Sequence, residues 1–131
     1  MRRTILIVED SDAWTAALQI ALEAIPGIQV VVATSAAEAL RLLDTREFAA
    51  LVTDLNMPRM DGFELIQNLR AGSRHERLPI VVISGDTDIE TPRRLTQLGV
   101  SAYFPKPFSP AIVRARLEQL LDAKTNIDHR P

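Results

Sequence analysis

The stretch Ala49-Ala-Leu-Val-Thr-Asp-Leu-Asn-Met-Pro-Arg-Met-Asp-Gly62 decides how this chain folds. It opens with a short apolar run rich in β-formers and reaches one carboxylate, Asp54. The polar segment that follows contains a proline and cannot continue a buried strand. The pattern therefore predicts a strand over residues 49–53 with Asp54 at its carboxyl end. In open parallel α/β sheets, ligands bind at that edge, because connecting loops and helix N-termini converge there.

The composition fits one compact domain of 131 residues with 47% hydrophobic content and a formal net charge of −2. Acidic and basic residues are interspersed, so neither a nucleic-acid-binding stripe nor a basic membrane-surface helix is indicated. The absence of cysteine excludes disulfides, thiolate catalysis and cysteine-ligated metals. The N-terminus leads straight into an apolar strand, without a signal-peptide core or a spanning segment of about 20 apolar residues, and we expect a soluble, cytoplasmic protein.

Four further apolar runs have the length and composition of buried strands. They cover residues 5–8, 28–33, 79–83 and 102–104. Apolar residues recur at helical spacing between these runs, and helix-start signals precede them. Ser35 and Glu38 have the spacing of a capping box, Asp61 can cap the third helix, and Pro92 suits the first turn of the fourth. Five strands alternating with five helices predict a doubly wound parallel sheet, because right-handed crossovers place helices on both faces.

Polar side chains follow four of the five strands at the predicted carboxyl edge. They are Glu9 and Asp10, then Asp54, Ser84 and Lys106. If the first and third strands are neighbours, three carboxylates crowd together, and their repulsion would raise a pKa or demand a cation. Oxygen ligands without His or Cys nearby favour a hard ion, Mg²⁺ or Mn²⁺. Such an ion would neutralise an incoming phosphoryl group while Lys106 and Ser84 bind its other oxygens, and Asp54 could then act as a nucleophile.

Each of these residues also has an ordinary structural interpretation. An Asp after a strand is usually a turn former or a helix cap, and Glu9-Asp10 could simply begin the first helix. Ser84 could belong to a loop and Lys106 to a solvated turn. Taken singly, each residue favours the structural interpretation, whereas suitable groups at four strand ends together favour a site. We assign Trp14, the methionines and the leucine stripes to packing.

The chain resembles the response-regulator receiver domain, the CheY-like domain of two-component signalling, from about Thr4 to about Leu121. The resemblance rests on Ile7-Val-Glu-Asp10, Asp54-Leu-Asn-Met-Pro58 with Asp61-Gly62, Val82-Ile-Ser-Gly85 and Tyr103-Phe-Pro-Lys-Pro-Phe108. It implies a flavodoxin-like (βα)5 fold with strand order 2-1-3-4-5. It also implies a receiver domain over residues 1–123, with residues 124–131 as a C-terminal tail or the start of a linker.

By this resemblance, Asp54 is the phosphoacceptor and takes a phosphoryl group from a phosphohistidine in a Mg²⁺-dependent reaction. Asp10, Asp54 and the backbone carbonyl of Asn56 would hold the metal, with Glu9 acting through water. The implied role is that of a regulatory phosphoacceptor rather than an enzyme, although such a domain promotes its own phosphotransfer and autodephosphorylation.

The resemblance also implies a switch. Lys106 would pair with one phosphoryl oxygen and Ser84 would hydrogen-bond another, and Tyr103 would turn inward when Ser84 moves. The output would be a population shift on the face made by the fourth helix, fifth strand and fifth helix. Asn56 and Asp86, each two residues beyond an active-site residue, would tune the attack of water on the aspartyl phosphate.

The implied partners are a sensor histidine kinase or phosphotransfer protein and a downstream effector protein or domain, with a phosphorylation-dependent homodimer as a further association. Direct nucleic-acid binding and membrane binding by this domain are not expected. Two other functions stay open. A phosphatase or phosphotransferase of the dehalogenase type needs a second Asp two residues after the nucleophile, where this chain has Asn56. A receiver-like interaction module would bind partners without phosphorylation.

Three residues depart from the commonest receiver pattern. Glu9 stands where Asp is more frequent, which lengthens the arm but keeps the charge. Pro105 removes a backbone donor from the end of the fifth strand. Pro92 shortens the fourth helix and lengthens the segment before it, and we expect phosphorylation to reorder residues 85–92.

Overall fold

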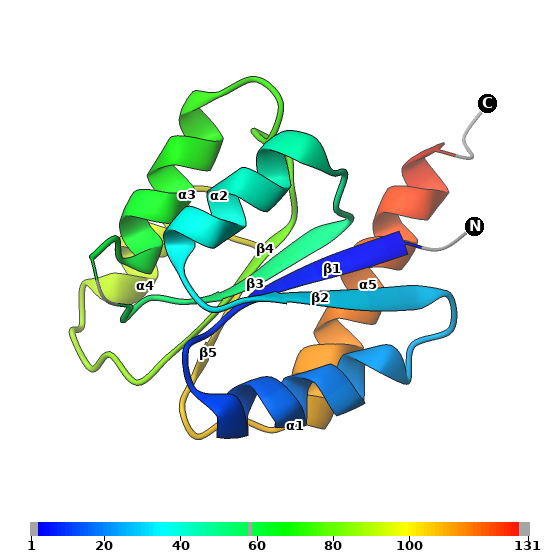
Figure 1. Ribbon diagram of the computed structural model, residues 1–131, viewed down its shortest axis with the longest axis horizontal. Coiled ribbons are helices and arrows are strands. Elements are labelled where there is room, and N and C mark those ends of the chain that lie inside the picture. The colour runs from blue at the N-terminus through cyan, green and yellow to red at the C-terminus, as the bar shows by residue number, and fades with distance from the viewer. Residues whose placement is uncertain (1–2, 58, 129–131) are drawn as a thin grey trace.

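The computed structural model describes residues 3–57 and 59–128 (Figure 1). Within these residues, five strands and five helices alternate along the chain, as predicted. The strands are β1 (Arg3–Val8), β2 (Ile28–Ala33), β3 (Ala50–Asp54), β4 (Ile80–Ser84) and β5 (Ala102–Pro105). The helices are α1 (Asp12–Glu23), α2 (Ala36–Thr45), α3 (Gly62–Ala71), α4 (Thr91–Gln97) and α5 (Pro110–Asp128).

The strands form one parallel sheet in the order β2-β1-β3-β4-β5, which confirms the doubly wound fold that we predicted. Helices α1 and α5 cover one face of this sheet, and α2, α3 and α4 cover the other (Figure 1). Alternate residues of β1 enter the two cores: Ile5 and Ile7 face α1 and α5, and Leu6 and Val8 face the other layer. Because both faces are covered, every residue of β3 and β4 is buried.

The strand ends differ from the predicted ones by one or two residues, and the sheet pairing explains the differences. Strands β3 and β4 extend to include Asp54 and Ser84, because each of these residues still pairs with the neighbouring strand. Pro105 belongs to β5 and pairs with Ser84. It is tolerated there because β5 is an edge strand, which pairs on one side only.

The predicted helix starts are found. The Ser35 hydroxyl accepts a hydrogen bond from the Glu38 N–H at 3.1 Å, and the Asp61 carboxylate accepts one from the Glu64 N–H at 2.9 Å. Helix α4 has seven residues and carries Pro92 in its first turn, as the sequence predicted. These local signals fix where α2, α3 and α4 leave the carboxyl edge of the sheet.

Helix α5 continues to Asp128 and therefore includes part of the segment 124–131 that we assigned to a tail or linker. Residues 129–131 of that segment lie outside the described residues. Among the helices that the structure describes, none combines the length and apolar character needed to cross a bilayer.

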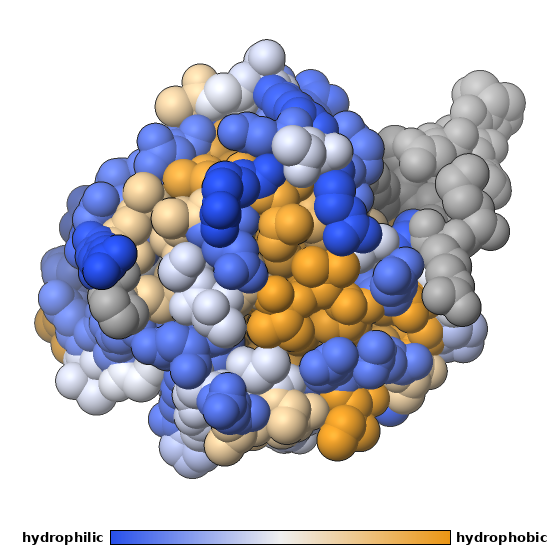
Figure 2. All heavy atoms as spheres, viewed as in Figure 1, coloured by the Kyte–Doolittle hydropathy of each residue, from blue (hydrophilic) through white to orange (hydrophobic). Residues whose placement is uncertain are grey.

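The edge strand β2 carries a visible apolar surface. Figure 2 shows hydrophobic residues gathered between α1 and α2, where β2 runs. Ile28, Val31 and Val32 of this strand are only half-buried, and Ile20 of α1 is 75% exposed. The exposure follows from topology, because β2 pairs with β1 alone and has no strand on its outer side. Apolar side chains on the surface are common in soluble domains.

Candidate functional site

Three carboxylates meet where β1 and β3 end. These strands are neighbours in register, with Val8 opposite Thr53, so the residues that follow them lie together. Glu9, Asp10 and Asp54 each place one oxygen within 4.8 Å of the others. Glu9 and Asp54 are 1% and 4% exposed, whereas Asp10 is exposed to solvent. The structure thus brings together the acidic residues that the sequence placed at this edge.

Lys106 reaches the same cluster from the end of β5. Its Nζ lies 2.9 Å from Glu9 Oε2 and 3.2 Å from Asp54 Oδ2. Its backbone N–H donates to the Ser84 carbonyl at 2.8 Å, which continues the pairing of β4 with β5 past Pro105. One ammonium therefore pairs with two of the three clustered carboxylates, and the four groups together keep an excess of negative charge.

The pKa shifts follow from this geometry. Burial raises the pKa of the Glu9 carboxyl above its ordinary value, although hydrogen bonds from Lys106 and from the Ser11 N–H oppose the shift. Burial alone would lower the pKa of Lys106, but its hydrogen bond to Glu9 and the charges of Asp54 and Glu9 outweigh burial and raise it. Lys106 is therefore held as a cation, while the charged form of Glu9 is penalised by its burial.

The donor set fits a hard divalent cation. The three clustered groups offer carboxylate oxygens, which Mg²⁺ and Mn²⁺ prefer, and the cluster contains neither His nor Cys. An added positive charge would also offset the burial of Glu9. The residues at this edge are therefore suited to hold such an ion.

The backbone around Asp54 is tightly constrained. Its Oδ1 accepts a hydrogen bond from the Asn56 N–H at 3.2 Å, while its Oδ2 faces Lys106. Helix α3 begins against this strand end, with the Gly62 N–H donating to the Leu55 carbonyl at 2.8 Å. A Cβ at Gly62 would overlap the Asp54 carbonyl oxygen and lie 2.7 Å from the Leu55 Cα. Glycine at this position therefore allows α3 to approach the phosphoacceptor candidate.

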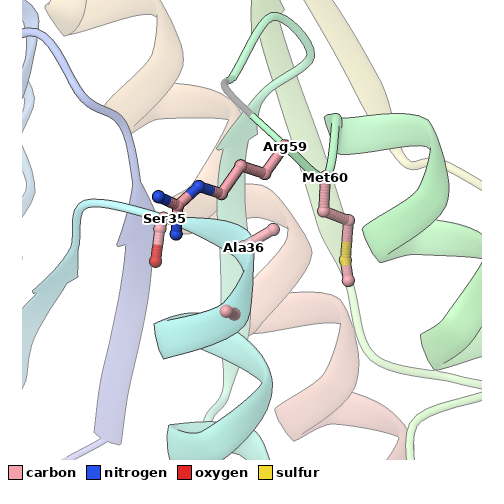
Figure 3. A pocket seen from close by; sticks show the side chains of 5 residues that line it. Ser35, Ala36, Arg59 and Met60 are labelled. Carbon is pink, nitrogen blue, oxygen red and sulfur yellow. The ribbon is translucent and has the colours of Figure 1, made fainter.

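The loop from β3 to α3 also carries Arg59, whose φ of 72° lies in the left-handed region. Figure 3 shows its side chain extending to Ser35 at the start of α2. With Met60 and the first residues of α2, it lines a pocket of about 80 Å³. None of the predicted site residues lines this pocket. Pro58, part of the motif that carries the family resemblance, lies outside the described residues.

Ser84 is fully buried and engaged by two donors. Its hydroxyl oxygen accepts from the Asn56 side-chain amide at 3.3 Å and from the Asp86 N–H at 3.0 Å. The Tyr103 hydroxyl in turn donates to the Asp86 carbonyl at 3.2 Å. Asn56 therefore links the strand ends of β3 and β4, since its backbone bonds Asp54 and its side chain bonds Ser84.

Asp86 connects this edge to α4. Its carboxylate accepts hydrogen bonds from the Thr91 hydroxyl and from the Asp88 N–H, both at 2.9 Å. Thr91 is buried. The burial of Tyr103 itself, together with the nearby charge of Asp86, raises the pKa of the Tyr103 hydroxyl. The sequence analysis did not identify Thr91 as part of the site, because nothing in local spacing indicates a side-chain partner five residues earlier.

Trp14 also belongs to the surroundings of the site, although we had assigned it to packing from its helical spacing. Its ring centroid lies 4.6 Å from that of Phe108, with the planes tilted by 30°. The Lys106 Nζ lies 5.4 Å from the same Trp14 centroid. The sequence could have indicated that these aromatic residues lie near the site, because Trp14 follows Asp10 by four residues and Phe108 follows Lys106 by two.

Comparisons with known proteins give a consistent result. The family model described as the response regulator receiver domain matches residues 5–118. A chemotaxis protein CheY homolog from Campylobacter jejuni is 31% identical over 118 residues, which cover 89% of this chain and 91% of that protein. A response regulator receiver protein from Pseudomonas putida has a solved structure with a TM-score of 0.83 and 32% identity, covering 91% of this chain and 98% of that one. The solved structure of a sensor protein from Polaromonas sp. JS666 has a TM-score of 0.83 and 35% identity, covering 94% of this chain and 98% of that one.

Proposed function

The chain belongs to the response regulator receiver family of two-component signalling, and from this premise we propose that Asp54 accepts a phosphoryl group from a phosphohistidine. The observation that carries the proposal is the position of Asp54, buried at the end of β3 between Lys106 and two further carboxylates. One Asp54 oxygen attacks phosphorus, and an O–P bond forms as the P–N bond breaks, leaving its electron pair on the imidazole. Water later attacks the aspartyl phosphate and releases inorganic phosphate and the free carboxylate.

The transfer is proposed to depend on Mg²⁺, with Mn²⁺ as a substitute. Asp10, Asp54 and the Asn56 backbone carbonyl would hold the ion, and Glu9 would act through water. When bound, the ion neutralises charge on the phosphoryl oxygens. The oxygen-only donor set and the burial that raises the pKa of Glu9 support this assignment.

Lys106 and Ser84 are proposed to bind the phosphoryl oxygens. Lys106 already lies beside Asp54, so its ammonium needs only to exchange one oxygen partner for another. The Ser84 hydroxyl accepts from Asn56 and Asp86, and turning toward a phosphoryl group would weaken both bonds.

Loss of the bond from the Asp86 N–H to Ser84 would release the segment that leads to α4. Tyr103 would then move inward, because its hydroxyl partner is the carbonyl of the same Asp86. The result is a population shift on the face made by α4, β5 and α5. A downstream effector protein or domain would read this face, and phosphorylation could also promote a homodimer.

Asn56 and Asp86 are proposed to tune the lifetime of the aspartyl phosphate. Asn56 contacts both Asp54 and Ser84, so its replacement by Ala changes the space that an attacking water would use. Phosphorylated N56A and D86A should lose phosphate at rates different from wild type, measured by intact mass over time. Asn68→Ala, a change on the exposed side of α3, is the matched control. Decay rates equal to wild type in N56A and D86A would contradict the role.

The phosphoryl donor is proposed to be a sensor histidine kinase or a phosphotransfer protein. Family membership favours a regulatory phosphoacceptor over the two other functions. A dehalogenase-type phosphatase would need a general acid at Asn56, whose amide instead donates to Ser84. A passive interaction module would have no need for two buried carboxylates, Glu9 and Asp54, beside a lysine.

The direct test is incubation of the full chain with acetyl phosphate and Mg²⁺, followed by intact-mass measurement. A gain of one phosphoryl group that Asp54→Ala abolishes and Asp44→Ala retains supports the proposal. Asp44 is an exposed acidic residue of α2 and controls for chemistry at any surface carboxylate. Rapid release of inorganic phosphate without accumulation of the phosphorylated chain would instead indicate an enzyme, and neither labelling nor phosphate release would indicate the passive module.

A further inference from the structure

Trp14 and Phe108 form an aromatic pair beside the active-site lysine. Trp14 lies in the first turn of α1, and Phe108 lies in the connection from β5 to α5, which passes that turn in Figure 1. The two helices pack against the same face of the sheet. The pair therefore joins two segments that are far apart in sequence, next to the point where Lys106 leaves β5.

The Lys106 ammonium lies between this pair and the carboxylates. Its Nζ donates to Glu9 at 2.9 Å and to Asp54 at 3.2 Å, and it lies 5.4 Å from the Trp14 ring centroid. The Lys106 side chain is 16% exposed, so water competes only weakly for the ammonium. An ammonium within about 6 Å of an indole centroid is attracted by the ring, and the attraction grows as water is removed.

A packing role alone does not explain this arrangement. Trp14 is half-buried, and its stacking partner Phe108 is half-buried as well. Trp14 precedes Leu18 by one helical turn on the same face of α1, but Leu18 and Leu22 are buried whereas Trp14 is only half-buried. Trp14 lies at the end of this helix nearest Asp10, within cation–π range of Lys106, which pairs with two carboxylates of the cluster.

We propose that Trp14 is a positioning residue for Lys106, whose indole ring holds the ammonium beside Asp54 so that it meets an incoming phosphoryl group. The inference rests on the proposed role of Lys106 in binding that group. Without the ring, the ammonium gains rotamers directed to solvent, and a fraction of the molecules presents no cation to the phosphoryl oxygens. Given the range of cation–π energies, the loss should weaken binding of a phosphoryl mimic by about two- to thirtyfold.

The first arm of the test measures the dissociation constant of beryllofluoride, with Mg²⁺ present, by isothermal titration calorimetry on the full chain. Trp14→Leu should bind more weakly by the stated factor, whereas Trp14→Phe keeps an aromatic ring and should recover at least half of the lost binding free energy. Phe48→Leu is the control, because the Phe48 ring lies 5.5 Å from the Arg46 guanidinium, close to the 5.4 Å between Trp14 and Lys106, and is away from the carboxylate cluster. Equal affinities in wild type and Trp14→Leu, or no recovery in Trp14→Phe, would overturn the proposal.

The second arm needs no phosphoryl mimic. Trp14 is the only tryptophan, so emission excited beyond the absorption band of tyrosine reports on its ring alone. Lys106→Met removes the cation and should change emission intensity and wavelength, and Arg46→Met should change neither. Unchanged emission in Lys106→Met would overturn the contact. If wild type fails to bind beryllofluoride while this emission change is seen, the proposed phosphoacceptor function fails and the contact between Trp14 and Lys106 stands.

Discussion

Replacing Asp10 by Asn should stabilise the metal-free protein and remove most of its response to Mg²⁺. The Lys106 ammonium pairs with Glu9 and Asp54, which leaves one net negative charge on these neighbours of Asp10. At a separation of 4.8 Å, two unit charges repel by about 3–4 kcal/mol at an effective dielectric constant of about 20. Because Asp10 is exposed, water screens this repulsion, and we expect a net gain of about 1 kcal/mol.

The measurement is thermal unfolding of wild type and D10N in excess EDTA and again in saturating MgCl₂. A gain of about 1 kcal/mol in EDTA corresponds to a midpoint about 3–5 °C higher for a chain of this length. Wild type should be stabilised by Mg²⁺, by about 2.7 kcal/mol at a hundred times the dissociation constant, and D10N should lose most of that response because it lacks one of the proposed charged ligands.

Asp12→Asn is the matched control. Asp12 lies two residues further on, in the first turn of α1 and outside the carboxylate cluster. Its loss removes a favourable interaction with the helix dipole and should cost about 0.3–1 kcal/mol, the opposite sign. D10N that is destabilised in EDTA, or that keeps the full Mg²⁺ response, would refute the reasoning about charge crowding at this edge.

Three further predictions test other contacts. Gly62→Ala should destabilise the protein by about 2–3 kcal/mol in urea titrations, because its Cβ overlaps the Asp54 backbone, whereas Gly72→Ala, with open space around it, should be nearly neutral. Thr91→Val removes the hydroxyl donor to Asp86 and should accelerate amide exchange in residues 86–91 about fivefold, and unchanged exchange would contradict a structural role for this bond. Burial raises the pKa of Glu9 in the folded state, so the free energy of unfolding of wild type in EDTA should fall as the pH rises through that pKa. Glu9→Gln should lack this fall, and identical profiles of unfolding free energy against pH in the two proteins would refute the prediction.

Most of the fold could be predicted from local pattern. Buried runs of β-formers separated by amphipathic segments indicate a parallel sheet covered on both faces, and the caps at Ser35 and Asp61 fix helix starts. Strand ends were less predictable, since they depend on the neighbouring strand. Asp54 and Ser84 remain inside their strands because each still has a partner residue, which no local pattern reports.

The candidate site was likewise predictable in part from the sequence. Its acidic residues and Lys106 lie at or directly after strand ends, so parallel topology alone brings them to one edge. The contacts between side chains from different loops could not be predicted, because spacing along a strand or helix says nothing about a partner elsewhere. The Asn56 amide on Ser84 and the Trp14 ring beside the Lys106 ammonium are of this kind.

The most direct test of the central claim is a crystal structure of the full chain with Mg²⁺ and beryllofluoride. We predict the beryllium bonded to an Asp54 oxygen, its fluorines in contact with Lys106 Nζ and Ser84 Oγ, and the metal on Asp10 and Asp54. Beryllofluoride bound away from Asp54, or a metal that leaves both aspartates without a ligand role, would contradict the account.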